Sequence, residues 1–105
     1  MNVEMYVLTD KYSRPRITIA IAEAEKGIFS RGIALCSKKD WIDTDLGIIK
    51  AKGRLQKAIK NKSKSLPINS DKAIRILFEA NSFPFKYKAD YDVQLTEYEK
   101  VLLGV

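Results

Sequence analysis

The sequence predicts an α+β fold, in which an N-terminal antiparallel β-meander of about three strands is followed by two or three helices. Two patterns support this prediction. Isoleucines alternate with smaller residues through 17–21, and a period of two is typical of a strand with one buried face. Apolar residues then recur at helical spacing between Ile48 and Ile59, which indicates an amphipathic helix. With 105 residues, the chain is expected to form a single domain, residues 1–105.

Three β-favouring runs make up the predicted meander. They cover residues 3–8, 16–23 and 28–37. The Lys26-Gly27 pair lies between the second and third runs, where a hairpin turn is expected. One face of the second run consists of isoleucines, and the other consists of the small residues Thr18, Ala20 and Ala22. The small face leaves room for another element to pack closely on the sheet.

Helix signals occur at three later places. The first helix is expected to run from a cap at Asp43 or Thr44 to about Lys62. The other two are expected over residues 71–80 and between a Thr96/Glu99 capping box and Gly104, with residues 86–94 extended or irregular. Gly47 and Gly53 lie inside the first helix, where glycine costs about 1 kcal/mol relative to alanine. They therefore predict a close approach by the sheet, a second subunit or a ligand.

The composition excludes several classes of function. The chain has no histidine and one cysteine, Cys36, which excludes an intrachain disulfide, a Cys/His zinc cluster and histidine-based acid–base catalysis. Acidic residues are scattered singly, so we expect a protein that is not an enzyme and uses neither a cofactor nor a metal. No apolar run is long enough to span a bilayer. The N-terminus lacks a basic-then-apolar signal pattern, which predicts a cytoplasmic location.

The net charge of +6 comes from 19 basic and 13 acidic residues, and it is unevenly distributed. Residues 50–64 contain seven basic residues and no acidic residue. Lys50, Arg54 and Lys57 recur at steps of four and three, so they share one helix face. Such a face attracts polyanions or phosphorylated ligands, or it is simply solvated.

Arg31 is the sharpest candidate for an anion contact. In a regular strand it shares a face with Ile33 and Leu35, which point to the core, and an arginine is rarely buried unless it is paired. Four explanations are open: a bulge beside Gly32 turns it outward, its head reaches water, or it binds a carboxylate or an anion. The candidate ligand-binding residues are Arg31, Arg54, Lys57, Asn81 and Phe83, and the residues giving supporting electrostatics are Lys38, Lys39 and Lys50. Asn81 offers an amide to base edges, and Phe83 offers a ring for stacking.

The stretch RGIALCSKKDWIDTDLGIIKAKGRLQKAIK resembles a motif of small proteins encoded by bacteriophages. The matching positions, within residues 31–58, are Arg31, Gly32, Ile33, Ala34, Cys36, Ser37, Asp40, Gly47, Gly53, Arg54, Lys57 and Ala58. The chain looks most like phage sponges that counter Thoeris immunity by sequestering a cyclic ADP-ribose signal. This resemblance implies a sheet followed by helices, no catalytic machinery and homo-oligomers, dimers or higher. It also implies a nucleotide pocket formed by Arg31, Arg54, Asn81 and Phe83.

Three functions are therefore compared. The first is a non-enzymatic phage protein that sequesters a phosphorylated immune signal, of the cyclic ADP-ribose or cyclic oligonucleotide type, in the cytoplasm of an infected bacterium. The second is a small basic nucleic-acid-binding phage accessory protein, and the third is an inhibitor directed at a host defence enzyme. A basic helix stripe suits a polymer, whereas the scarcity of aromatic residues between the basic ones counts against a single-strand binder.

Overall fold

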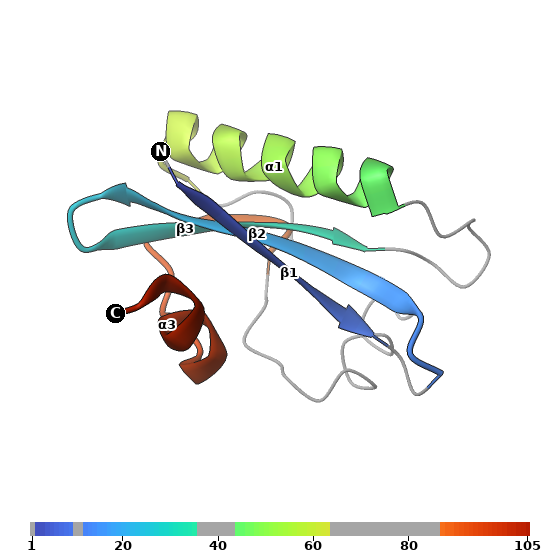
Figure 1. Cartoon of the computed structure of the whole chain (residues 1–105). Coiled ribbons are helices and arrows are strands. Elements are labelled where there is room, and N and C mark those ends of the chain that lie inside the picture. Colours follow the sequence, from blue (N-terminus) through green and yellow to red (C-terminus); the bar gives the residue numbers. More distant parts are fainter. Residues whose placement is uncertain (1, 10–11, 36–43, 64–86) are drawn as a thin grey trace.

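The computed structural model of the protein describes residues 2–9, 12–35, 44–63 and 87–105. The elements in chain order are β1 (Val3–Thr9), β2 (Pro15–Glu25), β3 (Ile28–Leu35), α1 (Thr44–Asn61), β4 (Ala89–Tyr91) and α3 (Glu97–Leu103). The strands form one sheet, with α1 on one side and α3 on the other (Figure 1). The predicted α+β class and its N-terminal meander are confirmed, and the described helices number two.

The sheet is antiparallel throughout, in the order β1-β2-β3-β4. In the centre of the meander, Tyr6 pairs with Ile19, and Ile19 pairs with Ile33. The β2–β3 turn contains Gly27 with a φ of 80°, a left-handed conformation that glycine adopts without steric cost. The segment expected to be extended or irregular contributes the short strand β4, which pairs with residues 30–32 of β3.

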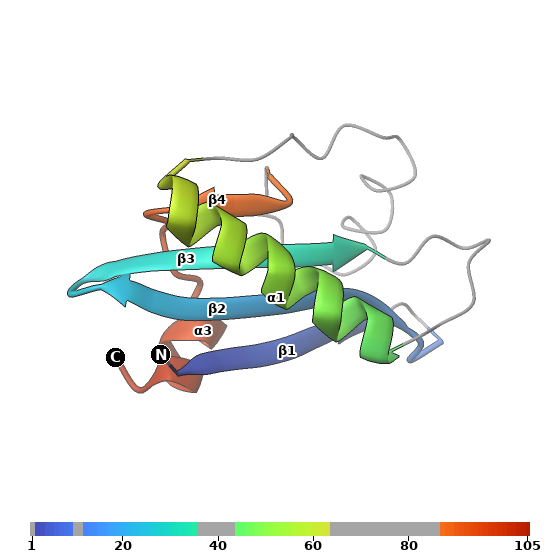
Figure 2. The ribbon, with the colours of Figure 1, turned by 90° about the horizontal axis from the view of Figure 1, so that it is seen from above.

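The first helix packs on the small-residue face of the sheet. The buried residues of this contact are Ala20, Ala22, Ala34, Ala51 and Leu55. A Cβ atom on Gly32 would lie 2.2 Å from the carbonyl oxygen of Ala51 and 2.4 Å from the backbone nitrogen of Leu55, so only glycine fits there. Figure 2 shows the helix crossing the sheet diagonally, with its N-terminal end over β1 and its C-terminal end toward β4.

The two glycines inside α1 have different surroundings. A Cβ atom on Gly47 would lie 2.9 Å from Oγ1 of Thr18 in β2, so this glycine allows close contact with the sheet. A Cβ atom on Gly53 would have no atom within 4 Å. Of the approaches left open for the two glycines, contact with the sheet is present at Gly47, whereas packing against the described residues does not explain Gly53.

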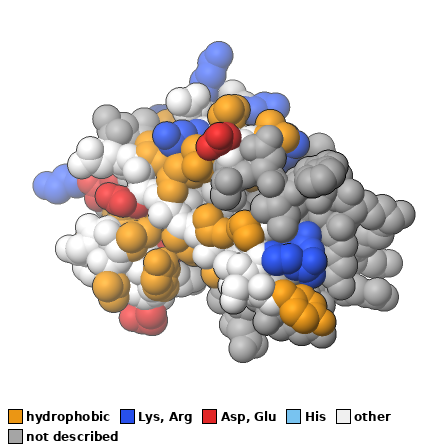
Figure 3. Space-filling view, turned by 45° about the vertical axis from the view of Figure 1, so that its right-hand side comes forward, with side chains coloured by type: hydrophobic (Ala, Val, Ile, Leu, Met, Phe, Trp, Pro, Cys, Tyr) orange, Lys and Arg blue, Asp and Glu red, His pale blue; other side chains and the backbone are white. Residues whose placement is uncertain are grey.

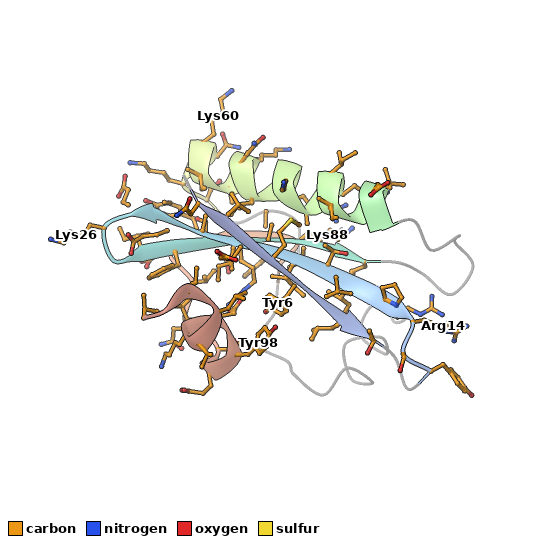
Figure 4. The ribbon with its side chains drawn as sticks, viewed as in Figure 1. Tyr6, Arg14, Lys26, Lys60, Lys88 and Tyr98 are labelled. Atoms are coloured by element: carbon orange, nitrogen blue, oxygen red, sulfur yellow. The ribbon has the colours of Figure 1, made fainter. Side chains whose placement is uncertain are left out.

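The opposite face of the sheet has larger side chains. Ile17, Ile19 and Ile33 form a fully buried cluster there, and Tyr6 packs against it. Tyr6 also contacts Tyr98 of α3, with ring centroids 5.0 Å apart and an interplanar angle of 59°, and Figure 4 shows both rings on the α3 side of the sheet. Aromatic contact thus ties α3 to the N-terminal strand.

Both ends of α3 have the predicted capping residues. The backbone N–H of Glu99 donates to Oγ1 of Thr96 at 3.1 Å, and the backbone N–H of Thr96 donates to Oε1 of Glu99 at 3.0 Å. Gly104 follows the helix with a φ of 74°, and its N–H donates to the carbonyls of Lys100 and Val101. The capping box and the glycine stop are confirmed.

The helix expected over residues 71–80 lies outside the described residues. Within the described part of the chain, neither helix is long and apolar enough to cross a membrane.

Candidate functional site

Arg31 lies in the middle of β3 and is buried, with only 4% of its surface exposed. The register is regular through Arg31 and Gly32, which pair with Ile21 and Ala20 of β2. A bulge therefore does not turn this side chain outward, and its head does not reach water. As the alternation of residues in the strand predicts, Arg31 points to the large-residue face of the sheet, where α3 lies.

A carboxylate from α3 neutralises this buried guanidinium. Nε of Arg31 donates to Oε2 of Glu99 at 2.9 Å, and Nη2 donates to the other carboxylate oxygen, Oε1. Nη2 also donates to the backbone carbonyl of Gln94 at 3.0 Å. Glu99 itself has no exposed surface. This bidentate pairing is the strong form of an arginine–carboxylate contact.

Tyr6 completes the cluster by donating its hydroxyl proton to Oε2 of Glu99 at 2.9 Å. Burial favours a neutral Glu99, but hydrogen bonds from Arg31, from the Thr96 backbone and from Tyr6 together lower the pKa of this carboxyl group. Burial first, and then the negative charge of Glu99, raise the pKa of the Tyr6 hydroxyl well above 10.0. We call Tyr6, Arg31 and Glu99 the buried cluster. An incoming phosphate would have to displace Glu99 before it could bind Arg31.

Arg54 has a different environment, on the flank of α1. Its Nη1 donates to the backbone carbonyl of Ile33 at 2.6 Å, next to the point where the N–H of Ile33 donates to the carbonyl of Lys88. The side chain is half-buried, and burial lowers the pKa of its guanidinium. Among the described residues, no carboxylate is paired with Arg54 in an ion pair or hydrogen bond. Arg54 therefore provides positive charge that a ligand can use.

Lysines extend this charge along α1. Lys50, Lys57 and Lys60 are all exposed, and together with Arg54 they follow one another at steps of four, three and three. We call these four residues the basic stripe. Gly53 lies among them with open space above it, and Asp45 in the first turn is the single acidic residue of the helix. In Figure 3, blue side chains project at the upper edge of the molecule, where α1 lies, and Figure 4 shows Lys60 pointing into solvent.

The candidate residues are thus only partly brought together. Arg54, Lys57 and Lys50 share the outer flank of α1, whereas Arg31 lies on the opposite face of the sheet and is paired with Glu99. The remaining candidates, Lys38, Lys39, Asn81 and Phe83, lie outside the described residues.

The phage-like motif turns out to contain many packing residues. Four of its matching positions lie where the helix and sheet meet or where a larger side chain would collide: Gly32, Ala34, Gly47 and Ala58. Among the matching residues that the structure describes, Arg54 and Lys57 carry exposed or half-exposed charge. Much of the sequence resemblance therefore describes how a helix packs on a strand, and less of it describes a ligand site.

Two features were missed at the sequence level. The capping box identified Glu99 as a helix-start residue, but no spacing rule links it to Arg31, which is 68 positions away. The second is an exposed aromatic–arginine pair in the β1–β2 turn, where the guanidinium carbon of Arg14 lies 5.1 Å from the ring centroid of Tyr12. The short sequence YSRPR is its only signal.

Comparison of the chain with protein-family models, with curated proteins and with solved structures finds no match.

Proposed function

We propose that this protein is a non-enzymatic binder of phosphate-rich nucleotide ligands, and that nucleic acid is the ligand its geometry suits best. The observation that supports this proposal is the basic stripe: three exposed lysines and one half-buried arginine along a helix face, with a single acidic residue in the whole helix. Nucleic-acid affinity depends largely on contacts between such side chains and backbone phosphates.

The length of the stripe favours a polymer over a single phosphate. Lys50 and Lys60 are ten residues apart, which corresponds to about 15 Å along an α-helix at roughly 1.5 Å per residue. An exposed helix face is convex, and it contacts successive phosphates of a strand more readily than it encloses a small molecule, since small-molecule sites are usually concave.

Gly53 supports close approach of the ligand. An exposed glycine in a helix interior costs about 1 kcal/mol relative to alanine, and no contact with the described residues requires it here. Its position between Lys50 and Lys57 leaves the helix backbone accessible at the centre of the stripe. A phosphate backbone can therefore lie against the helix without meeting a side chain at that point.

A second candidate is sequestration of a phosphorylated signal nucleotide by a phage-encoded, oligomeric sponge. The observation that favours it is Arg54, whose half-buried guanidinium is held by the Ile33 carbonyl and is paired with no carboxylate among the described residues. A planar guanidinium with N–H groups to spare suits bidentate phosphate recognition. The resemblance to anti-Thoeris sponges points the same way, and homo-oligomers belong to this second proposal.

One titration separates the two candidates. The protein is mixed with a labelled duplex, a labelled single strand, and a panel of cyclic and linear adenine nucleotides, and binding is followed by anisotropy and by melting temperature. A nucleotide at 100 times its Kd should add about 2.7 kcal/mol of stability. Oligonucleotide binding that weakens steeply with salt, without a shift from any mononucleotide, supports the nucleic-acid function and rejects the sponge. The reverse result rejects the nucleic-acid function.

Matched charge variants locate the contact surface. Lys50→Gln/Lys57→Gln should weaken duplex binding and reduce the slope of log K against log salt by about 1.8, since each phosphate contact contributes about 0.9. Lys26→Gln/Lys100→Gln removes the same charge from exposed positions outside α1 and should leave that slope nearly unchanged. Equal losses in the two variants would show that net charge, and not the basic stripe, binds the ligand.

A further inference from the structure

The turn between β1 and β2 presents an aromatic ring and an arginine side by side. Tyr12 is 66% exposed, Arg14 is exposed, and the guanidinium carbon of Arg14 lies 5.1 Å from the centroid of the Tyr12 ring. Such a cation–π contact is weakly attractive at an exposed site. Two flat groups are therefore placed together in solvent.

The backbone of the turn holds this pair in place at some cost. Ser13, between the two side chains, has a φ of 60°, a left-handed conformation that is sterically unfavourable for residues other than glycine. Pro15 follows directly and begins β2, so its ring fixes the backbone next to Arg14. Residues held in strained conformations of this kind are common at functional sites.

The chemistry of the pair matches an unpaired nucleobase. Bases of single-stranded nucleic acid stack on tyrosine rings and on arginine guanidinium planes, largely without regard to sequence. A duplex keeps its bases stacked on each other and offers such a ring no free face. The pair therefore suits a single strand, and it supplies the exposed aromatic that the basic stripe itself lacks.

The turn lies at the end of the sheet near the start of α1, and Figure 4 shows Arg14 at the opposite end from Lys26. Thr18 in β2 lies under Gly47 in the first turns of the helix. Four strand residues separate Arg14 from Thr18, or about 13 Å at roughly 3.3 Å per residue. From Gly47, ten helix residues, or about 15 Å, lead to Lys57. A mononucleotide is too short to touch both ends, whereas a single strand of several nucleotides spans them.

We propose that Tyr12 and Arg14 form a base-stacking contact for single-stranded nucleic acid whose phosphates continue onto the basic stripe of α1. This inference rests on the nucleic-acid function proposed above, and it adds a preference for single strands over duplexes.

The test compares a labelled 15-nucleotide dT strand with a labelled duplex of equal length. Tyr12→Ala should weaken single-strand binding about 5- to 150-fold, which corresponds to the 1–3 kcal/mol of one base–aromatic stack. Tyr12→Phe should retain binding, and neither change should alter duplex binding or the salt slope. Tyr98→Ala removes a tyrosine of similar exposure, 59%, on the α3 side of the sheet, and serves as the matched control once its fold is verified by circular dichroism.

Each outcome decides the inference. Single-strand binding that is unchanged in Tyr12→Ala, or a loss that is equal for strand and duplex, overturns it. If binding depends on Lys50 and Lys57 but not on Tyr12, the nucleic-acid function stands and only the stacking contact is rejected. If the unaltered protein binds neither oligonucleotide, the function and the stacking contact fail together.

Discussion

Glu99 in the first turn of α3 accepts hydrogen bonds from two nitrogens of Arg31 in the middle of β3, and both side chains are almost fully buried. The same carboxylate accepts from the Thr96 backbone and from the Tyr6 hydroxyl. One side chain therefore begins a helix, neutralises a charge in the sheet and contacts the N-terminal strand.

Removing this carboxylate should destabilise the protein strongly. Glu99→Ala leaves the Arg31 guanidinium buried without a counter-charge, and breaking a buried pair typically costs about 3–5 kcal/mol. Glu99→Gln keeps a capping acceptor at the helix start but removes the charge, so it separates the two roles. Urea unfolding measures both, and Glu97→Gln, at an exposed position in the same turn, should change stability by no more than about 0.5 kcal/mol. A loss below about 1 kcal/mol in Glu99→Ala contradicts the pairing.

The double variant Arg31→Met/Glu99→Leu provides the complementary test. Replacing both members of a buried ion pair with apolar residues of similar size is often neutral or stabilising. We therefore expect the double variant to recover most of the stability lost in Glu99→Ala. Arg31→Glu should fail to fold, because it places two carboxylates together in the interior, so that variant reports on folding and not on ligand binding.

Acid should destabilise the protein through Glu99. The pKa of this carboxyl group lies below its ordinary value of 4.5 in the folded protein, so the unfolded chain takes up the proton first as the pH falls. The contribution of Glu99 is complete at neutral pH and is lost as the pH falls from about 5 through the folded pKa. Urea midpoints measured from pH 7 to pH 2 should fall more for the unaltered protein than for Glu99→Gln. Parallel curves would contradict a charged Glu99.

Alkali should also destabilise the protein, in this case through Tyr6. Burial and the Glu99 charge raise the pKa of its hydroxyl above the ordinary 10.0, so the folded protein holds this proton more tightly than the unfolded chain does. The associated stability is complete below pH 10 and declines as the pH rises above it. Tyr6→Phe removes the titrating group and should show a shallower alkaline decline in thermal unfolding. An unchanged decline would exclude Tyr6 as its source.

Alanine substitutions at two glycines should have opposite effects. Gly32→Ala would force a Cβ atom against the backbone of α1, which cannot move as a flexible side chain can, and overpacking of this kind costs about 1–3 kcal/mol or more. Gly53→Ala points into open space and should stabilise the helix by about 1 kcal/mol. If Gly53 also admits a ligand backbone, the same change should weaken oligonucleotide binding while it raises the melting temperature. Urea and binding titrations on one preparation test both effects.

Ser30 should be replaceable without loss of stability. Ser30 has no exposed surface, and its hydroxyl forms no hydrogen bond with any described residue. A buried polar group without a partner costs roughly 1–3 kcal/mol, so Ser30→Ala should be neutral or stabilising by about 1 kcal/mol. Urea unfolding of Ser30→Ala beside the unaltered protein measures this change. A clear loss in Ser30→Ala would show that the hydroxyl does have a partner.

Local patterns were enough to predict most of the described fold. The alternation through Ile17, Ile19 and Ile21 placed β2, and the stripe from Ile48 to Ile59 placed α1, because both depend on residues close in sequence. The Thr96/Glu99 box also works over three residues. The segment that forms the short strand β4 was left open between extended and irregular, because it pairs with residues 57 to 61 positions earlier in the chain.

The candidate site was harder to predict for the same reason. The alternation of residues along the strand predicted that Arg31 points inward. This alternation alone does not identify the distant carboxylate that pairs with Arg31. The basic stripe was visible because Lys50, Arg54 and Lys57 lie on one helix. The Tyr12–Arg14 pair has no periodic signal, since the geometry of a turn, here with Ser13 in a left-handed conformation, decides which neighbours face each other.

The long separation between Arg31 and Glu99 also orders the folding of the chain. β1, β2, β3 and α1 are all synthesised by residue 61, and their contacts are close in sequence, so they can assemble early. Until Glu99 arrives, the meander must hold an uncompensated positive charge on one of its faces. The assembly of β1, β2, β3 and α1 is therefore incomplete without α3. We expect hydrogen exchange to show that α3 opens and closes more readily than the β2–β3 hairpin.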